Sequence, residues 1–244
     1  MGIYINNLDR YIDGDVFVST DTLDQLRIAA PVQASCYRQT HSIENQYPSQ
    51  GKRYQFMFDW FSVTETFIPG NTSKIDGEES QHRGWVRGKV SMEQYFKRGF
   101  YSSGYLVEGV MSNQPFFANY QGTIINASSF NPLQDSPTLL LPNFRAFNYV
   151  AGGWRNVFQI RKNLDFRLEG YVFKPFERIV AQPDQRATLS QDLVKFYLAG
   201  TAGLVLHSSV GPISLSTNYY NDKQHQFGAL LHVGFLLFQK TSLN

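Results

Sequence analysis

The chain has 244 residues, of which 22 are basic and 20 acidic, so the formal net charge is +2. This balance excludes the strongly basic surface of a nucleic-acid-binding protein, and the single cysteine excludes an internal disulfide framework. Aromatic residues make up 15% of the chain, yet the mean hydropathy is −0.31 and no apolar run approaches the ~18 residues of a membrane helix. A soluble β-sandwich and a membrane β-barrel both remain, because a barrel hides its apolar residues in alternation.

The first segment, residues 1–31, is poorly defined and predicts at most one strand, around residues 15–19. Its start lacks the basic region and apolar core of a signal peptide. An exported barrel would need such a signal, so under that reading we expect the natural N-terminus to lie upstream. A second segment, residues 32–244, begins with a weak strand at residues 32–43 and shows clear alternation from Gly51 onward.

Residues 85–97 show the clearest period of two, which is typical of a strand with two different faces. One face is apolar and the other polar: Val86, Gly88, Val90, Met92 and Phe96 against Arg87, Lys89, Ser91, Glu93 and Lys97. Residues 164–173 repeat the pattern, with Asp165, Arg167 and Glu169 on the polar face, and residues 227–237 repeat it again. In a membrane, Arg87 or Lys89 facing lipid would cost about 2–4 kcal/mol each. We therefore expect the apolar face to point outward and the charged face to line a polar interior.

Five further strands are predicted, at residues 54–67, 100–112, 152–160, 195–207 and 213–220. In the first of them the apolar phase slips near Trp60 and Phe61, as a β-bulge would cause. The connections alternate between short ones, such as 98–99 and 161–163, and long ones, such as 68–84 and 113–149. Short turns on one rim and long loops on the other are typical of outer-membrane barrels and are not expected of a sandwich.

Several short stretches resemble landmarks of a known family, in the family's order along the chain. They are residues 47–52 (YPSQGK), 67–71 (FIPGN), 114–120 (QPFFANY), 211–216 with 218–220, and 232–238 (HVGFLLF). By this set, most of residues 45–240 resembles the BamA-type superfamily of β-barrels, also called bacterial surface antigens. Within it, the best match is the C-terminal barrel of Bacteroidetes-type patatin-like phospholipases.

The resemblance implies an all-β fold, an antiparallel transmembrane β-barrel located in the bacterial outer membrane. This chain would be its C-terminal portion, supplying about 8–10 strands of a sixteen-stranded barrel, with the long loop 113–149 directed into the lumen. A half-barrel leaves two unpaired edges, which lipid does not tolerate. The expected partners are therefore outer-membrane lipid and a missing N-terminal half or another chain, a homodimer included.

The superfamily carries a Val-Arg-Gly-aromatic motif on its long sixth loop, and here Phe144, Arg145, Ala146 and Phe147 occupy that place. Ala146 departs from the glycine of the wider superfamily. The resemblance implies that the loop arginine pairs with acidic groups on the barrel wall. We therefore predict that Arg145 pairs with Glu169 or Asp165, because a guanidinium held away from bulk water needs a carboxylate.

The terminal strand also resembles the family's, with Gly234, Phe235 and Phe238 as the signal through which the barrel assembly machinery would recognise it. No catalytic residue is carried over, since the lipase Gly-x-Ser-x-Gly elbow and Asp-Gly-Gly/Ala motif are absent from the sequence. The five histidines show no metal-ligand spacing, so neither a metal nor another cofactor is predicted.

Three functions are open at this point. The first is a barrel that does no chemistry itself and anchors an upstream patatin-like phospholipase domain, with a conduit for that domain left open. The second is an assembly or secretion barrel of the insertase type. The third is a soluble β-rich binding module. Upstream sequence would separate the first two, and detergent dependence would separate both from the third.

Overall fold

The computed structural model describes residues 2–6, 22, 24–41, 48–71, 73–190, 195–209, 211–222 and 225–234. Ten strands form one antiparallel sheet, ordered β1-β2-β3-β4-β5-β6-β7-β10-β11-β12. Their bounds are β1 Gly2–Asn6, β2 Asp24–His41, β3 Gly51–Ile68, β4 Glu79–Arg98, β5 Tyr101–Ser112, β6 Tyr149–Arg161, β7 Leu164–Pro175, β10 Tyr197–Ser208, β11 Gly211–Tyr220 and β12 Phe227–Val233. The predicted all-β antiparallel fold is confirmed.

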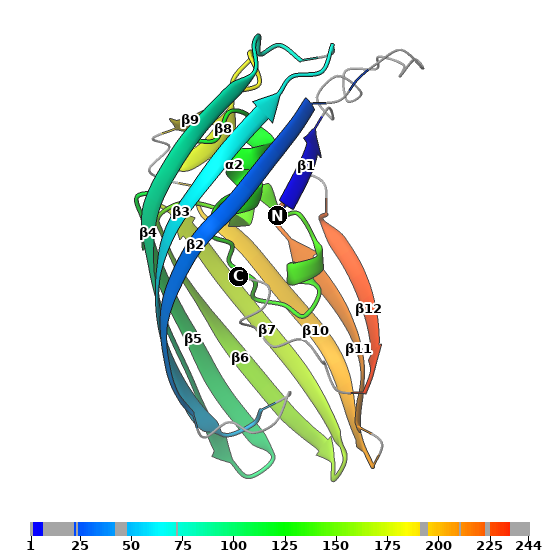
Figure 1. The fold of residues 1–244 in the computed structure, drawn as a ribbon. Coiled ribbons are helices and arrows are strands. Elements are labelled where there is room, and N and C mark those ends of the chain that lie inside the picture. Colours follow the sequence, from blue (N-terminus) through cyan, green and yellow to red (C-terminus); the bar gives the residue numbers. More distant parts are fainter. Residues whose placement is uncertain are drawn as a thin grey trace.

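The sheet bends into a deep trough, as Figure 1 shows. Main-sheet strands that follow each other in the chain are paired with each other. β7 pairs with β10, although β8 (Arg178–Ala181) and β9 (Ala187–Ser190) lie between them in the chain and form a separate hairpin. β1 and β12 are the two edges of the described sheet. The described strands thus form an open trough, and closure into a barrel remains a prediction.

The two rims of the trough differ as the connections predicted. Short turns join β4 to β5, β6 to β7 and β10 to β11 at one end. Gly99, with φ of 62°, and Gly211, with φ of 116°, supply the left-handed backbone that two of these turns require. The opposite end carries the long connections. The rim with the short turns is called the turn end below, and the opposite rim the loop end.

The longest connection, residues 113–148, folds back against the concave side of the sheet and is called the inner loop (Figure 1). It contains helix α2 (Tyr120–Asn126) and the short 3-10 helices η1 (Ser136–Thr138) and η2 (Pro142–Phe144). The apolar core lies between this loop and the sheet, with Leu106, Val110, Phe130, Phe144 and Phe173 among its buried members. In the described part of the chain, every helix is too short or too polar to cross a membrane.

Strand starts differ from the prediction mainly in β2 and β4. β2 begins at Asp24 and not at residue 32, β4 begins at Glu79 and not at residue 85, and β1 at residues 2–6 was not predicted. The strand predicted around residues 15–19 lies outside the described residues. Pairing with β3 extends β2 toward the N-terminus, into residues whose own sequence shows no clear alternation of apolar and polar residues.

The predicted bulge at Trp60 and Phe61 is wrong. The register of β3 with β4 runs without a shift from Gly51 to Phe67, and the irregularity lies on β2, between Ala29 and Val32. The switch of apolar residues from one face of β3 to the other near Trp60 has a different cause. Beyond Trp60, the concave residues Val63 and Phe67 are buried in a cluster that includes Phe117 of the inner loop.

Candidate functional site

The sheet has an inverted distribution of polarity. Its concave face carries buried ionisable residues, namely Asp59, Glu65, Lys89, Glu93, Glu108, Arg155, Asp165 and Arg167. Its convex face carries exposed large apolar residues on each main-sheet strand from β3 to β12, namely Tyr54, Phe56, Phe58, Trp60, Val86, Val90, Phe96, Val107, Met111, Val150, Trp154, Leu168, Val172, Leu198, Leu204, Leu206, Leu215, Phe227, Leu231 and Val233. A water-soluble sheet packed on one face shows the reverse order.

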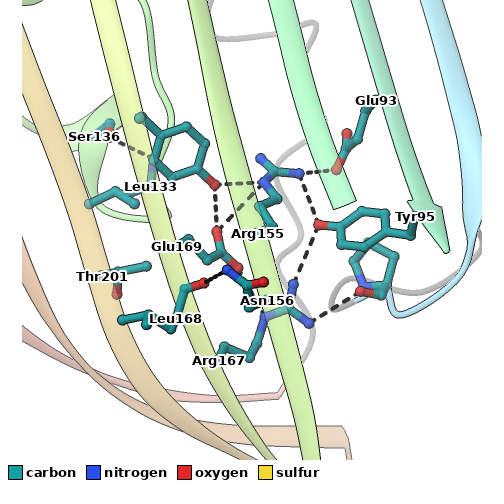
Figure 2. Close-up of polar contacts among 12 residues, drawn as sticks. Glu93, Tyr95, Leu133, Ser136, Arg155, Asn156, Arg167, Leu168, Glu169 and Thr201 are labelled. Carbon is teal, nitrogen blue, oxygen red and sulfur yellow. Dashed lines mark hydrogen bonds and ion pairs between the residues drawn. The ribbon is translucent and has the colours of Figure 1, made fainter. Parts of the chain in front are cut away.

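Arg155 on β6 is the centre of a polar network on the concave face (Figure 2). Its guanidinium forms an ion pair with Glu93 of β4 and lies 3.6 Å from Glu169 Oε2 of β7. Its Nε donates to the Tyr171 hydroxyl at 2.6 Å and its Nη1 to the Tyr95 hydroxyl at 3.0 Å. The guanidinium of this β6 residue thus has a carboxylate and a phenol partner on each of two other strands, β4 and β7, as a buried charge requires.

The network extends on both sides of Arg155. Arg167 Nε donates to Glu169 Oε1 at 3.0 Å, and Arg167 Nη1 donates to the carbonyl of Pro48 at 3.2 Å. On the other side, Arg53 Nη2 donates to Glu93 Oε2 at 2.7 Å. Both carboxylates therefore receive more than one donor, and the network links β3, β4, β6 and β7.

Further ion pairs follow β3, β4 and β5 toward the loop end. Arg87 Nη2 lies 2.8 Å from Asp59 Oδ2, and Lys89 Nζ lies 3.3 Å from Glu108 Oε1. Arg83 pairs with Glu65, whose second oxygen accepts from the backbone N–H of Ala118 in the inner loop at 2.5 Å. This last carboxylate ties the inner loop directly to the sheet.

The inner loop reaches both halves of the trough. Near β2, a Cβ placed on Gly122 would lie 2.2 Å from Leu26 Cδ2, so α2 approaches that strand as closely as glycine permits. On the opposite side, the Tyr220 hydroxyl of β11 donates to Asp135 Oδ1 at 2.5 Å and lies 2.8 Å from Ser136 Oγ. Between them, Phe130 stacks on Phe173 with ring centroids 6.0 Å apart.

The structure does not contain the predicted pair between Arg145 and Glu169 or Asp165. Arg145 Nη1 instead donates to backbone carbonyls of the inner loop, to Ile125 at 2.7 Å and to Ile124 and Ala127 at 3.3 Å. Glu169 is bonded to Arg167 and Tyr171, and Asp165 Oδ2 lies 2.8 Å from His207 Nε2. The carbonyls at the end of α2 compete for the guanidinium because the helix leaves them without intrahelical partners.

The other three residues of the loop motif are buried. Phe144 and Ala146 are almost fully buried, and Phe144 packs against Phe173, Tyr197 and Tyr220. Phe147 packs with Ile124, Ala127 and Ile179. Gln185 is the one non-glycine residue with positive φ among the described residues, so Ala146 needs no glycine-like backbone. This explains how alanine is accommodated there.

Of the terminal-strand residues, only Gly234 is described, with φ of 97° and its N–H donating to the carbonyl of Pro212 at 2.9 Å. Phe235 and Phe238 lie outside the described residues. The recognition of this strand by assembly machinery stays a prediction.

Gln185 joins three connections of the loop end. Its side-chain Oε1 accepts from the N–H of Lys74, and its backbone carbonyl accepts from the N–H of Tyr120 at the start of α2, at 3.1 and 2.9 Å. It lies in the turn of the β8–β9 hairpin with φ of 65° and is buried. The hairpin therefore covers α2 and is fastened to the β3–β4 connection.

Sequence reasoning missed Arg155, the most connected residue of the site. Alternation placed Glu93, Arg167 and Glu169 on the polar face, but the run Gly152-Gly153-Trp154 before Arg155 has no readable apolar period. Among the described residues, no cluster of histidine, cysteine and acidic side chains could hold a metal. The arrangement is one of mutually neutralised charges, suited to a stable polar interior.

Comparison with protein-family models, with curated proteins and with solved structures gave no match.

Proposed function

We propose that this chain forms part of the wall of an outer-membrane β-barrel, with its convex face toward lipid and its concave face toward a polar interior. The observation that carries the proposal is the inverted polarity of the sheet: exposed apolar side chains outside, buried ion pairs inside. A soluble monomer rarely exposes a contiguous apolar patch beyond roughly 300–600 Å². Here apolar residues extend across eight neighbouring strands, which suits a lipid environment.

Strand length and the border of the apolar area support the same proposal. β3 has 18 residues and β4 has 20, whereas a tilted membrane crossing needs about 9–11. Past Trp60 and Val86 the convex face becomes polar, with Ser62 Oγ 3.2 Å from His82 Nε2 and Thr66 Oγ1 3.4 Å from Ser80 Oγ. These two strands would therefore project beyond the bilayer at the loop end.

The role we propose for this barrel portion is to anchor an upstream patatin-like phospholipase domain. The sequence motifs support this choice. The inner loop occupies the concave side from β2 to β11, which favours anchoring over a wide conduit. The open edges β1 and β12 would be covered by further strands of the same protein or of another chain.

A matched pair of neighbouring substitutions tests the proposed orientation. Val90→Lys puts a cation on the convex face, where it would cost about 2–4 kcal/mol at mid-depth, whereas Ser91→Lys puts it on the concave face. We expect Val90→Lys to reduce the fraction of chain that resists alkaline carbonate extraction from membranes, and Ser91→Lys to leave most of it in place. The proposal would be contradicted if both variants were extracted to the same extent, or if alkaline carbonate extracted the unchanged chain.

A further inference from the structure

Two adjacent turns at the turn end carry four exposed basic side chains. Lys97 and Arg98 precede the turn between β4 and β5, and Arg161 and Lys162 lie at the turn between β6 and β7. β5 and β6 are neighbours in the sheet, with Tyr101 opposite Phe158, so the two turns lie side by side (Figure 1). Among the described residues, none of the four side chains has an acidic partner within ion-pair distance. We call these four residues the basic rim.

Exposed apolar side chains flank these cations in the sequence. Phe96 is 56% exposed, Phe100 is 70% exposed and Ile160 is 57% exposed. Phe96 and Phe100 bracket Lys97 and Arg98, and Ile160 directly precedes Arg161. The basic rim is therefore continuous with the apolar convex face.

The loop end is different in charge. Its exposed residues include acidic and basic side chains together, such as Asp76, Glu78 and Asp184 with Lys74 and Arg186. Arg186 forms an ion pair with Glu79 at 3.3 Å. Unneutralised positive charge is thus concentrated at the turn end of the described chain.

We infer that the basic rim binds the anionic phosphate headgroups of a phospholipid leaflet, an inference that rests on the proposed membrane location. Long basic side chains can extend from the edge of an apolar surface to headgroup phosphates while their stems stay in contact with acyl chains. Binding of an acidic protein segment would need the cations but not the apolar residues beside them. The aromatic and aliphatic residues beside each cation match a bilayer interface, where apolar and charged groups meet.

The full chain is reconstituted in phosphatidylcholine vesicles with a trace of spin-labelled phosphatidylglycerol or spin-labelled phosphatidylcholine. Electron paramagnetic resonance measures the fraction of each lipid that is immobilised by the protein. We expect a preference for phosphatidylglycerol of at least about threefold, since each basic residue near an anionic surface contributes to attraction. The preference should fall when salt is raised, with the immobilised phosphatidylcholine unchanged.

The quadruple variant Lys97→Gln, Arg98→Gln, Arg161→Gln and Lys162→Gln should bring the preference close to one. The control variant Lys74→Gln with Arg186→Gln removes cations from the loop end and should keep it. A wild-type preference near one, or equal loss in both variants, would overturn the lipid assignment. If neither labelled lipid is immobilised by the unchanged chain, the proposed membrane location itself fails. If the quadruple variant does not insert, the two double variants Lys97→Gln with Arg98→Gln and Arg161→Gln with Lys162→Gln are measured instead, and an unchanged preference in both would overturn the assignment to the basic rim.

Discussion

Arg155 shows what a single residue contributes to this structure. It is buried on the concave face and shares hydrogen bonds or ion pairs with Glu93, Glu169, Tyr95 and Tyr171. Arg155 supplies hydrogen-bond donors to buried carboxylates and hydroxyls that would otherwise lack compensation. Most of its contribution to stability therefore comes from compensating these buried groups, and less from charge attraction alone. The same argument explains why the residues around it on β4 and β7 are carboxylates and phenols.

Truncating Arg155 should therefore be costly. Arg155→Ala leaves Glu93 and Glu169 with fewer donors, and we expect unfolding to become easier by about 3–5 kcal/mol. Arg161→Ala, on the exposed turn of the same strand, should change stability by less than about 0.5 kcal/mol. Urea unfolding of both variants in detergent micelles, followed by tryptophan fluorescence, measures the difference. Comparable stability of the two variants would show that the network is not needed.

Two glycines on neighbouring strands offer a second residue-scale test. A Cβ on Gly153 would lie 2.2 Å from Tyr171 Cδ1, whereas a Cβ on Gly170 would meet no atom within 4 Å. Gly153→Ala should displace the Tyr171 ring from Arg155 and cost about 1–3 kcal/mol, the usual price of overpacking. Gly170→Ala, on the convex face, should be tolerated. The same unfolding measurement applies, and a reversed order of the two variants would refute the packing described.

At the scale of elements, the sequence predicted which residues share one face of a strand, but not which residues those side chains contact. Alternation placed Arg87, Lys89 and Glu93 on one face because a strand has a period of two whatever its neighbours are. The partner of Arg145 was not predictable, since the carbonyl oxygens that bind it become available only where α2 ends. The irregularity that lies on β2 was predicted on β3 because the sequence shows a change of polarity at Trp60. That change is explained by packing against the inner loop, which the sequence pattern does not show.

Gln185 gives a test of how the elements at the loop end are joined. Gln185→Gly keeps the positive φ and the backbone carbonyl that binds the Tyr120 N–H, and it removes the side chain that binds the Lys74 N–H. Losing one hydrogen bond of about 1 kcal/mol should speed hydrogen exchange at Lys74 by about fivefold. Exchange at Tyr120 should change little. Mass spectrometry of peptides covering both positions reads the two amides, and equal acceleration of both would contradict a local role.

At the scale of the whole molecule, the ten-stranded trough, the inner loop and the two unlike rims form one arrangement. Charges are paired where the loop and sheet enclose them, apolar side chains cover the convex face, and unneutralised cations lie at the turn end. The all-β class and the loop alternation could be predicted from sequence because both depend on local patterns. The curvature and the edges could not, since they depend on strand pairing across the sheet.

Tryptophan quenching by lipids with brominated acyl chains tests the central claim most directly, because the three tryptophans lie on both faces. Trp60 and Trp154 are convex and 44% and 58% exposed, whereas Trp85 is concave and 7% exposed. Three variants of the full chain, each keeping one tryptophan and replacing the other two with phenylalanine, are reconstituted in the brominated lipid. We predict strong quenching of Trp60 and Trp154 and weak quenching of Trp85. Quenching of Trp85 alone, or of none of the three, would contradict a lipid-facing convex surface.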